Sequence, residues 1–208
     1  MSTLRKLAQV LVAPMFLALL IGCSGSSDSG TETGAAPTAA DVGTTNAAGE
    51  VEVDPAVAST VRNLGNLGLI NPALVNTVAT PAITPAAAQA INAAILAGFS
   101  GEYIVRWYPD PRLPDVNSEG SRLRIFENGS ATLTLVPLRP NDPVEVQASS
   151  PLRGFITLDG KVSLQGRTTK DDVMVATGTL NSTDKSLSDG QVLALGQSYR
   201  WSIVPGDS

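Results

Sequence analysis

The chain has 208 residues, with 14 basic and 19 acidic side chains and no histidine, so its formal net charge is −5. The lack of histidine excludes a histidine-liganded metal, a Ser-His-Asp triad and a Cys-His pair. The acidic balance argues against nucleic-acid binding, which normally needs a basic face, and no sequence motif indicates a cofactor.

The first 22 residues have the pattern of a secretory signal peptide. Arg5 and Lys6 precede a mainly apolar, uncharged stretch over residues 7–20, which one glutamine and one proline interrupt. This stretch is too short and too broken for a membrane-spanning helix, and no charged stop-transfer run follows it. We therefore expect residues 1–22 to be removed on export, which takes away two basic residues and leaves a net charge of −7.

The signal segment ends in Leu20-Ile21-Gly22-Cys23-Ser24, which resembles the lipobox of bacterial lipoproteins. In that family the cysteine thiol takes a diacylglyceryl group, and the amine freed by cleavage is acylated. The resemblance implies that Cys23, the only cysteine of the chain, carries the lipid that anchors the mature protein. Ser24, where an aspartate would signal inner-membrane retention, implies the outer membrane. The alternative is an ordinary secretory signal with a chance cysteine.

Residues 23–54 form an acidic segment rich in Ser, Gly, Thr and Ala. After Cys23 it holds no aromatic residue, no Leu or Ile, and no basic residue. So little apolar surface cannot offset the entropy cost of ordering the chain. We expect a disordered tether that spans on the order of 30 Å and lifts the folded part off the membrane.

Residues 55–99 are rich in Ala, Val, Leu and Ile, and Arg62 is their only charge. Three capping residues followed by proline predict three helix starts: Asp54-Pro55, Asn71-Pro72 and Thr84-Pro85. The helices should end near residues 64, 78 and 97, with Gly65 and Gly68 as stops for the first helix and Gly98 for the third. We expect this apolar helical segment to pack on the domain that follows. The alternative is a segment that docks on a partner.

From residue 100 to 205 the apolar period becomes two, which is typical of half-buried strands. Strands are predicted over residues 103–108, 122–127, 130–136, 144–148, 154–158, 161–165, 172–180, 191–195 and 199–204. Asn128-Gly129 and Asp159-Gly160 lie between strand pairs and predict hairpins with type I′ turns. The fold class is therefore mainly β, an antiparallel up-and-down meander of eight or nine strands, closed as a small barrel or folded as a sandwich. Gly101-Glu102-Tyr103 resembles the opening strand of small lipocalin-like barrels, but the likeness covers only a few residues and leaves both closures open.

Two long connections carry the candidate binding residues. Residues 108–115 and 137–143 each contain three prolines and one arginine. Successive connections of a meander alternate between its ends, so both loops should share the end opposite the turn at residues 128–129. Stiff loops lose less entropy on binding, and an aromatic pair leads into the first loop. The candidates are Trp107, Tyr108, Arg112 and Arg139; the alternative is that the prolines only end strands and protect edges.

Arg106, Arg122 and Arg124 lie on neighbouring predicted strands. They form either a basic stripe for an acidic or glycan ligand or the solvated face of the sheet. The acids at residues 171–172, 184 and 189 lack the alternation of a calcium loop and are read as turn formers.

These patterns favour a lipid-anchored cell-envelope protein whose β-domain is not an enzyme. The domain would bind an envelope protein or a small ligand, or support an envelope assembly. The alternative is an envelope enzyme that acts on glycans through Asp and Glu. A wide cleft lined by two close carboxylates would favour the enzyme, and a filled barrel interior would favour the binding protein.

Overall fold

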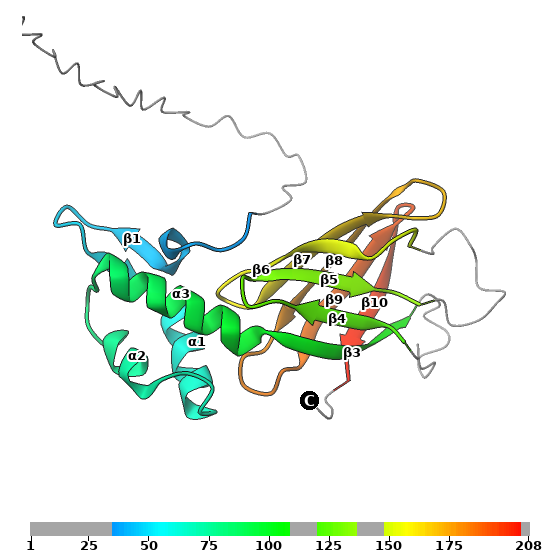
Figure 1. Cartoon of the computed structure of the whole chain (residues 1–208). Helices are drawn as coiled ribbons and strands as arrows, with labels where there is room; N and C mark the ends of the chain where they lie inside the picture. Colours follow the sequence, from blue (N-terminus) through cyan, green and yellow to red (C-terminus); the bar gives the residue numbers. More distant parts are fainter. Residues whose placement is uncertain (1–34, 109–119, 137–147, 205–208) are drawn as a thin grey trace, which may run out of the picture. The chain divides into compact units, whose positions relative to one another are not determined.

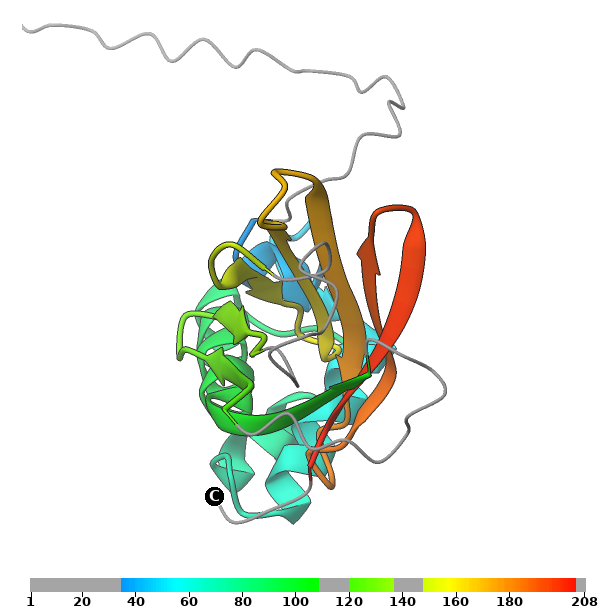
Figure 2. The same ribbon diagram turned by 90° about the vertical axis from the view of Figure 1, so that its right-hand side faces the viewer.

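The computed structural model describes residues 35–108, 120–136 and 148–204. Eight antiparallel strands close into a barrel in the order β10-β3-β4-β5-β6-β7-β8-β9 (Figures 1 and 2). Their bounds are β3 (Gly101–Tyr108), β4 (Arg122–Ile125), β5 (Ser130–Thr134), β6 (Leu152–Ile156), β7 (Lys161–Arg167), β8 (Val173–Leu180), β9 (Leu187–Ala194) and β10 (Gln197–Ile203). The predicted up-and-down meander is confirmed, and of its two possible closures the barrel is the one formed.

Strand β9 begins four residues before the predicted start. Asp189 has a φ of 53°, and the pairing of β8 with β9 shifts register between Thr177 and Thr179. This bulge lets the strand continue through a stretch that the sequence marks as a turn. The strand expected at residues 144–148 lies outside the described residues except for Ala148, which bridges to Thr168.

Two hairpins occur where the sequence predicts them, but with a different turn. Gly129 and Gly160 have φ angles of 79° and 88°, whereas Asn128 and Asp159 are not in the positive-φ region. The Gly129 N–H donates to the Phe126 carbonyl at 2.9 Å. This is a type I turn followed by a glycine bulge, so the prediction of type I′ turns was wrong at both places.

The turn with positive φ at both central positions joins β9 to β10. Leu195 and Gly196 have φ angles of 53° and 71°, and Ala194 pairs with Gln197 on either side. A leucine in this region is strained by about 1–2 kcal/mol. Nothing in the local sequence except the glycine predicts a tight turn here.

Apolar side chains fill the barrel along its described strands. Period-two alternation turns every second residue inward, and burial of each large aliphatic side chain contributes about 1.5–3 kcal/mol. Trp201 is 2% exposed, and its indole Nε1 donates to the Thr177 carbonyl at 2.8 Å. The largest fully buried strand residues are Leu123, Leu133, Leu152, Ile156, Leu164, Met174, Leu180 and Trp201.

The three helices begin where the sequence predicts. They are α1 (Pro55–Asn66), α2 (Pro72–Thr77) and α3 (Pro85–Phe99). The side chains of Asp54, Asn71 and Thr84 each accept a hydrogen bond from a first-turn N–H, as N-caps do. Among the described residues, no helix combines the length and the apolar character that crossing a membrane would require.

Of the three predicted stops, Gly68 does end α1: it follows the C-cap Leu67 and has a φ of 71°. Gly65 and Gly98 lie inside their helices, contrary to the prediction. A Cβ at Gly65 would collide with the Val75 side chain on α2, and one at Gly98 would lie 2.9 Å from the Leu64 side chain on α1. Both glycines therefore allow helices to approach closely.

The helices pack on one end of the barrel, here called the cap end. The only residue between α3 and β3 is Ser100, so the helix runs directly into the sheet (Figure 1). At this end Gly129 and Gly160 of two strand turns lie against Leu96 and Phe99 of α3. From the β8–β9 turn, Lys185 donates to the Gly98 carbonyl at 2.6 Å.

The expected disorder up to residue 54 was wrong for residues 39–53. They form η1 (Ala39–Val42), β1 (Gly43–Thr45) and β2 (Val51–Val53). Val42 and Val51 are buried, and the Val51 N–H donates to the Ile83 carbonyl at 2.8 Å. The segment is polar on average, so its composition alone does not show that these valines can pack on the apolar surface of the helices.

Candidate functional site: the arginine face of the barrel

The outer surface formed by the adjacent strands β10, β3, β4, β5 and β6 carries a group of arginines, which lie on all of these strands except β5. The pairing register aligns Glu102 with Arg124, Arg124 with Thr132, and Thr132 with Arg153 in one row across the sheet. Four of the arginines are exposed and Arg122 is half-buried. We call this set the arginine face: Arg106, Arg122, Arg124, Arg153 and Arg200.

Strand alternation explains why these side chains point outward. In β4, Leu123 and Ile125 are buried in the barrel, so the flanking arginines must face solvent. Neighbouring strands are about 4.8 Å apart, so Arg124 and Arg153 are roughly 10 Å apart across the sheet. Arg122 and Arg124 are about 7 Å apart along their strand. Several cations are thus within reach of one extended ligand.

The charge of this surface opposes that of the whole chain. Arg122 pairs with Glu102 at 3.6 Å, an exposed contact that contributes about 0–1 kcal/mol. Within the part of the chain that the structure describes, Arg106 and Arg153 form no ion pair. An acidic protein therefore presents a local excess of positive charge on one side of its barrel.

A shallow depression of about 790 Å³ lies at the cap end of this face and is lined by Arg124 and by two carboxylates, Glu102 and Glu127. The guanidinium of Arg124 lies 4.9 Å from the centroid of the Phe126 ring, and Phe126 is 37% exposed. Stacking restricts the guanidinium while leaving its N–H edge available to a carboxylate or phosphate. The Asn128 Oδ1 accepts two hydrogen bonds from Ser130, at 3.0 Å from the N–H and 2.7 Å from the hydroxyl. These bonds hold the Asn128 side chain within its own turn.

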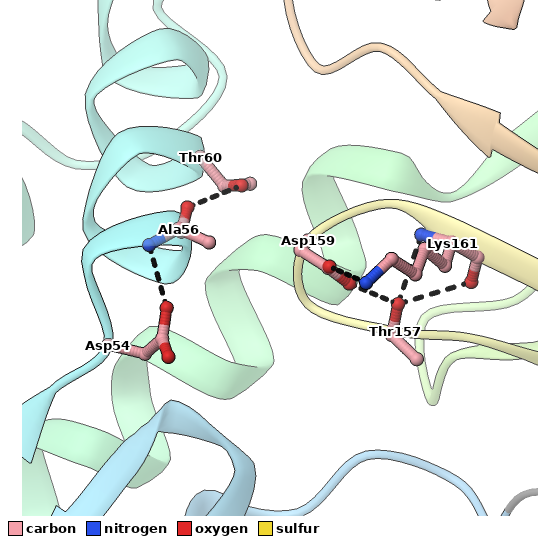
Figure 3. A network of polar contacts seen from close by, with 6 residues as sticks. All are labelled: Asp54, Ala56, Thr60, Thr157, Asp159 and Lys161. Atoms are coloured by element: carbon pink, nitrogen blue, oxygen red, sulfur yellow. Dashed lines mark hydrogen bonds and ion pairs between the residues drawn. The ribbon is translucent and has the colours of Figure 1, made fainter.

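A second depression, of about 430 Å³, also bears on the enzyme alternative because Asp41, Asp54 and Asp159 line it. Figure 3 shows two of these residues, Asp54 and Asp159. Each of the three carboxylates already forms hydrogen bonds or an ion pair with residues close to it in the sequence. Asp41 accepts from the Thr38 N–H at 2.6 Å, and Asp54 accepts from the Ala56 N–H at 2.7 Å.

Asp159 forms a 2.8 Å ion pair with Lys161 at the β6–β7 turn (Figure 3). Burial by itself would raise the pKa of Asp159, but hydrogen bonds from Lys161 and Thr157 and the charge of Lys161 outweigh it, so this pKa is lowered. A glycosidase general acid needs the opposite shift. Among the described residues, no group of acids is arranged to hold a metal ion. The three carboxylates of this depression are thus all engaged in local hydrogen bonds or an ion pair.

The predicted binding residues are only partly within the described structure. Trp107 and Tyr108 end β3 and pair with Trp201 and Arg200, but their side chains are outside the description. Arg112, Arg139 and the predicted lipid site Cys23 also lie outside the described residues. The strand order places the ends that flank both long connections at the same end of the barrel, opposite the cap end.

Sequence reasoning found three members of the arginine face and missed two. Arg153 was missed because the predicted strand began one residue later, at residue 154. Arg200 lies within a predicted strand, but only barrel closure brings β10 beside β3. No family model, no curated protein and no solved structure matches this chain, so the site is interpreted from its own chemistry.

Proposed function

We propose that the protein is a lipid-anchored cell-envelope protein whose barrel binds an acidic glycan on the arginine face, without catalysing a reaction. The arginine face is the observation that carries this proposal. Five guanidiniums lie on adjacent strands of a protein whose remaining charge is strongly acidic. Repulsion elsewhere would direct a polyanion to this one surface.

The shape of the surface suits a polymer better than a small molecule. The barrel core is occupied by side chains, and the depression at Arg124 is open. An extended chain crossing several strands can meet several guanidiniums in turn. Each exposed pair contributes only about 0.2–1 kcal/mol, but linked contacts act together because the later ones form within one complex.

The anchoring part of the proposal rests on the signal segment. Its positive start, short apolar stretch and lipobox-like ending at Cys23 support export and lipidation, and Ser24 supports an outer-membrane destination. A Cys23→Ser change should leave the protein uncleaved or unlipidated and release any processed form from membranes. A cleaved Cys23→Ser protein that stays fully membrane-bound would contradict the lipid anchor.

Binding is tested with the mature chain and polygalacturonate, a polymer with one carboxylate per sugar. Replacing both Arg124 and Arg153 by Gln should weaken binding about tenfold, since two exposed ion pairs together contribute on the order of 1.4 kcal/mol. Affinity should also fall as salt is raised.

A matched control removes the same charge elsewhere by replacing Arg62 and Lys161 with Gln. It should leave the affinity nearly unchanged. Equal losses in both double variants would show that only net charge matters. Binding of uncharged dextran with equal affinity would contradict recognition of acid groups, and release of new reducing ends from polygalacturonate would contradict the non-enzymatic assignment.

A further inference from the structure

The helical segment has a surface almost without charge. Between Asp54 and Glu102 the sequence contains no carboxylate, and Arg62 is its only charged side chain. Two large aliphatic side chains project from the connection between α1 and α2: Leu67 is 43% exposed and Leu69 is 49% exposed. This stands out in a protein that is strongly acidic elsewhere.

The connection that bears these leucines is an ordered helix end. The Gly68 N–H donates to the Gly65 carbonyl at 3.0 Å, and the Leu69 N–H donates to the Leu64 carbonyl at 2.9 Å. With a φ of 71° at Gly68, this is a Schellman motif, in which the residue after the glycine normally packs back on the helix. Here the side chain of Leu69 remains half exposed, while its backbone N–H is hydrogen-bonded to the helix.

We infer that Leu67 and Leu69 dock on the surface of the lipid bilayer and enter the boundary between headgroups and acyl chains. This inference rests on the proposed lipid anchor. A bilayer suits the site because the N–H groups of Leu67, Gly68 and Leu69 are all hydrogen-bonded within the chain and would not be left unsatisfied in apolar surroundings. A bilayer also suits the charge of the helical segment, because this segment has no carboxylate that anionic lipid would repel.

The reach of the anchor is compatible with this contact. Ala35, where the described chain starts, lies with Asp54 and Ala56 at the beginning of α1. Helix α1 has 12 residues and is therefore about 18 Å long, with the leucines at its far end. Ala35 follows Cys23 by 12 positions in the sequence, which can span up to about 40 Å. The lipid on Cys23 and the two leucines can thus reach the same bilayer. Because the anchor holds the protein at the membrane, even a weak contact of the leucines with the bilayer is effective.

The barrel carries another exposed aliphatic group, which suits a bilayer less well. Val173, Leu193 and Leu195 are 48%, 51% and 41% exposed. Asp171 and Asp172 immediately precede Val173, and Asp171 pairs with an arginine at 3.4 Å. Burying these charges in lipid would oppose insertion at this end.

The test places a new tryptophan on either side of the molecule. Mature full-length protein with Leu69→Trp, and a control with Ser198→Trp, are attached to vesicles of phosphatidylethanolamine and phosphatidylglycerol with brominated acyl chains. Ser198 is exposed on β10. Most of the emission added by Leu69→Trp should be quenched, and that added by Ser198→Trp should not. Adding Leu67→Asp to the Leu69→Trp protein should abolish the quenching with only a small fall in melting temperature, because a carboxylate at the end of α1 is mildly unfavourable.

Two preparations separate this inference from the proposed anchor. One is purified from membranes, and its mass shows whether Cys23 carries lipid. In the other, the Cys23 thiol is coupled to a maleimide phospholipid. Quenching in the coupled protein with no lipid on the purified one would refute the natural anchor and support the docking surface. A lipidated protein with no quenching in either preparation would refute docking alone, as would a dimer in solution that Leu67→Asp dissociates.

Discussion

Lys185 joins the barrel to the end of α3, and its removal should measure that contact. Its ammonium donates to the Gly98 carbonyl at 2.6 Å and lies 5.1 Å from the centroid of the Phe99 ring. This carbonyl belongs to the last helical turn, where a cation is favourable. The Ser100 N–H and hydroxyl already donate to the Leu96 and Ala97 carbonyls, and the β8–β9 turn adds a donor for the Gly98 carbonyl.

The magnitude follows from three contributions and one cost. The charged hydrogen bond contributes about 1.5 kcal/mol, and the helix dipole and the ring contribute about 0.5 kcal/mol each. Partial burial opposes them, which is why the pKa of Lys185 is lowered. After roughly 1 kcal/mol for this desolvation, Lys185→Met should destabilise the protein by about 1–2 kcal/mol. At about 2–4 °C per kcal/mol, the melting temperature should fall by about 3–6 °C.

Thermal unfolding followed by circular dichroism measures this fall. Methionine keeps the length of the side chain and the backbone strain of the φ of 57° at this position, so the charge and its donor are what change. The matched control is Arg62→Met at an exposed position of α1, which should shift stability by no more than about 0.5 kcal/mol. An unchanged melting temperature for Lys185→Met, or an equal fall for both variants, would refute the role of the Lys185 contact.

Three further changes test the packing. Burial raises the pKa of Tyr103 to about 12, above its ordinary value of 10. The stability that this burial contributes below pH 10 should therefore be lost as the pH rises through 12. Tyr103→Phe should remove this loss when denaturant unfolding is measured over the same pH range. Gly65→Ala should destabilise by about 1–3 kcal/mol in calorimetry despite the better helix propensity of alanine, since its Cβ meets Val75; adding Val75→Ala should recover part of the loss, and a more stable Gly65→Ala protein would contradict the close contact. Leu195→Asn should stabilise by about 1 kcal/mol in the same assay, because asparagine tolerates positive φ; destabilisation would mean that Leu195 makes a contact worth more than its strain.

The sequence by itself determined the local features of the fold. A capping side chain followed by proline starts a helix through contacts within four residues, so all three helix starts were predictable. Period-two alternation and a glycine between strands likewise set the meander. For the same reason, alternation along β4 was enough to place Arg122 and Arg124 on one outward face.

Only the tertiary structure decided which partners these elements meet. Gly65 and Gly98 read as helix stops, yet their small size serves contacts with Val75 and Leu64 that no local pattern reveals. The valines of the N-terminal segment found apolar partners on the helices and so became ordered. Barrel closure set Arg200 beside β3 and extended the arginine face to five strands, because strand pairing between distant segments depends on the whole sheet and not on the residues of either strand.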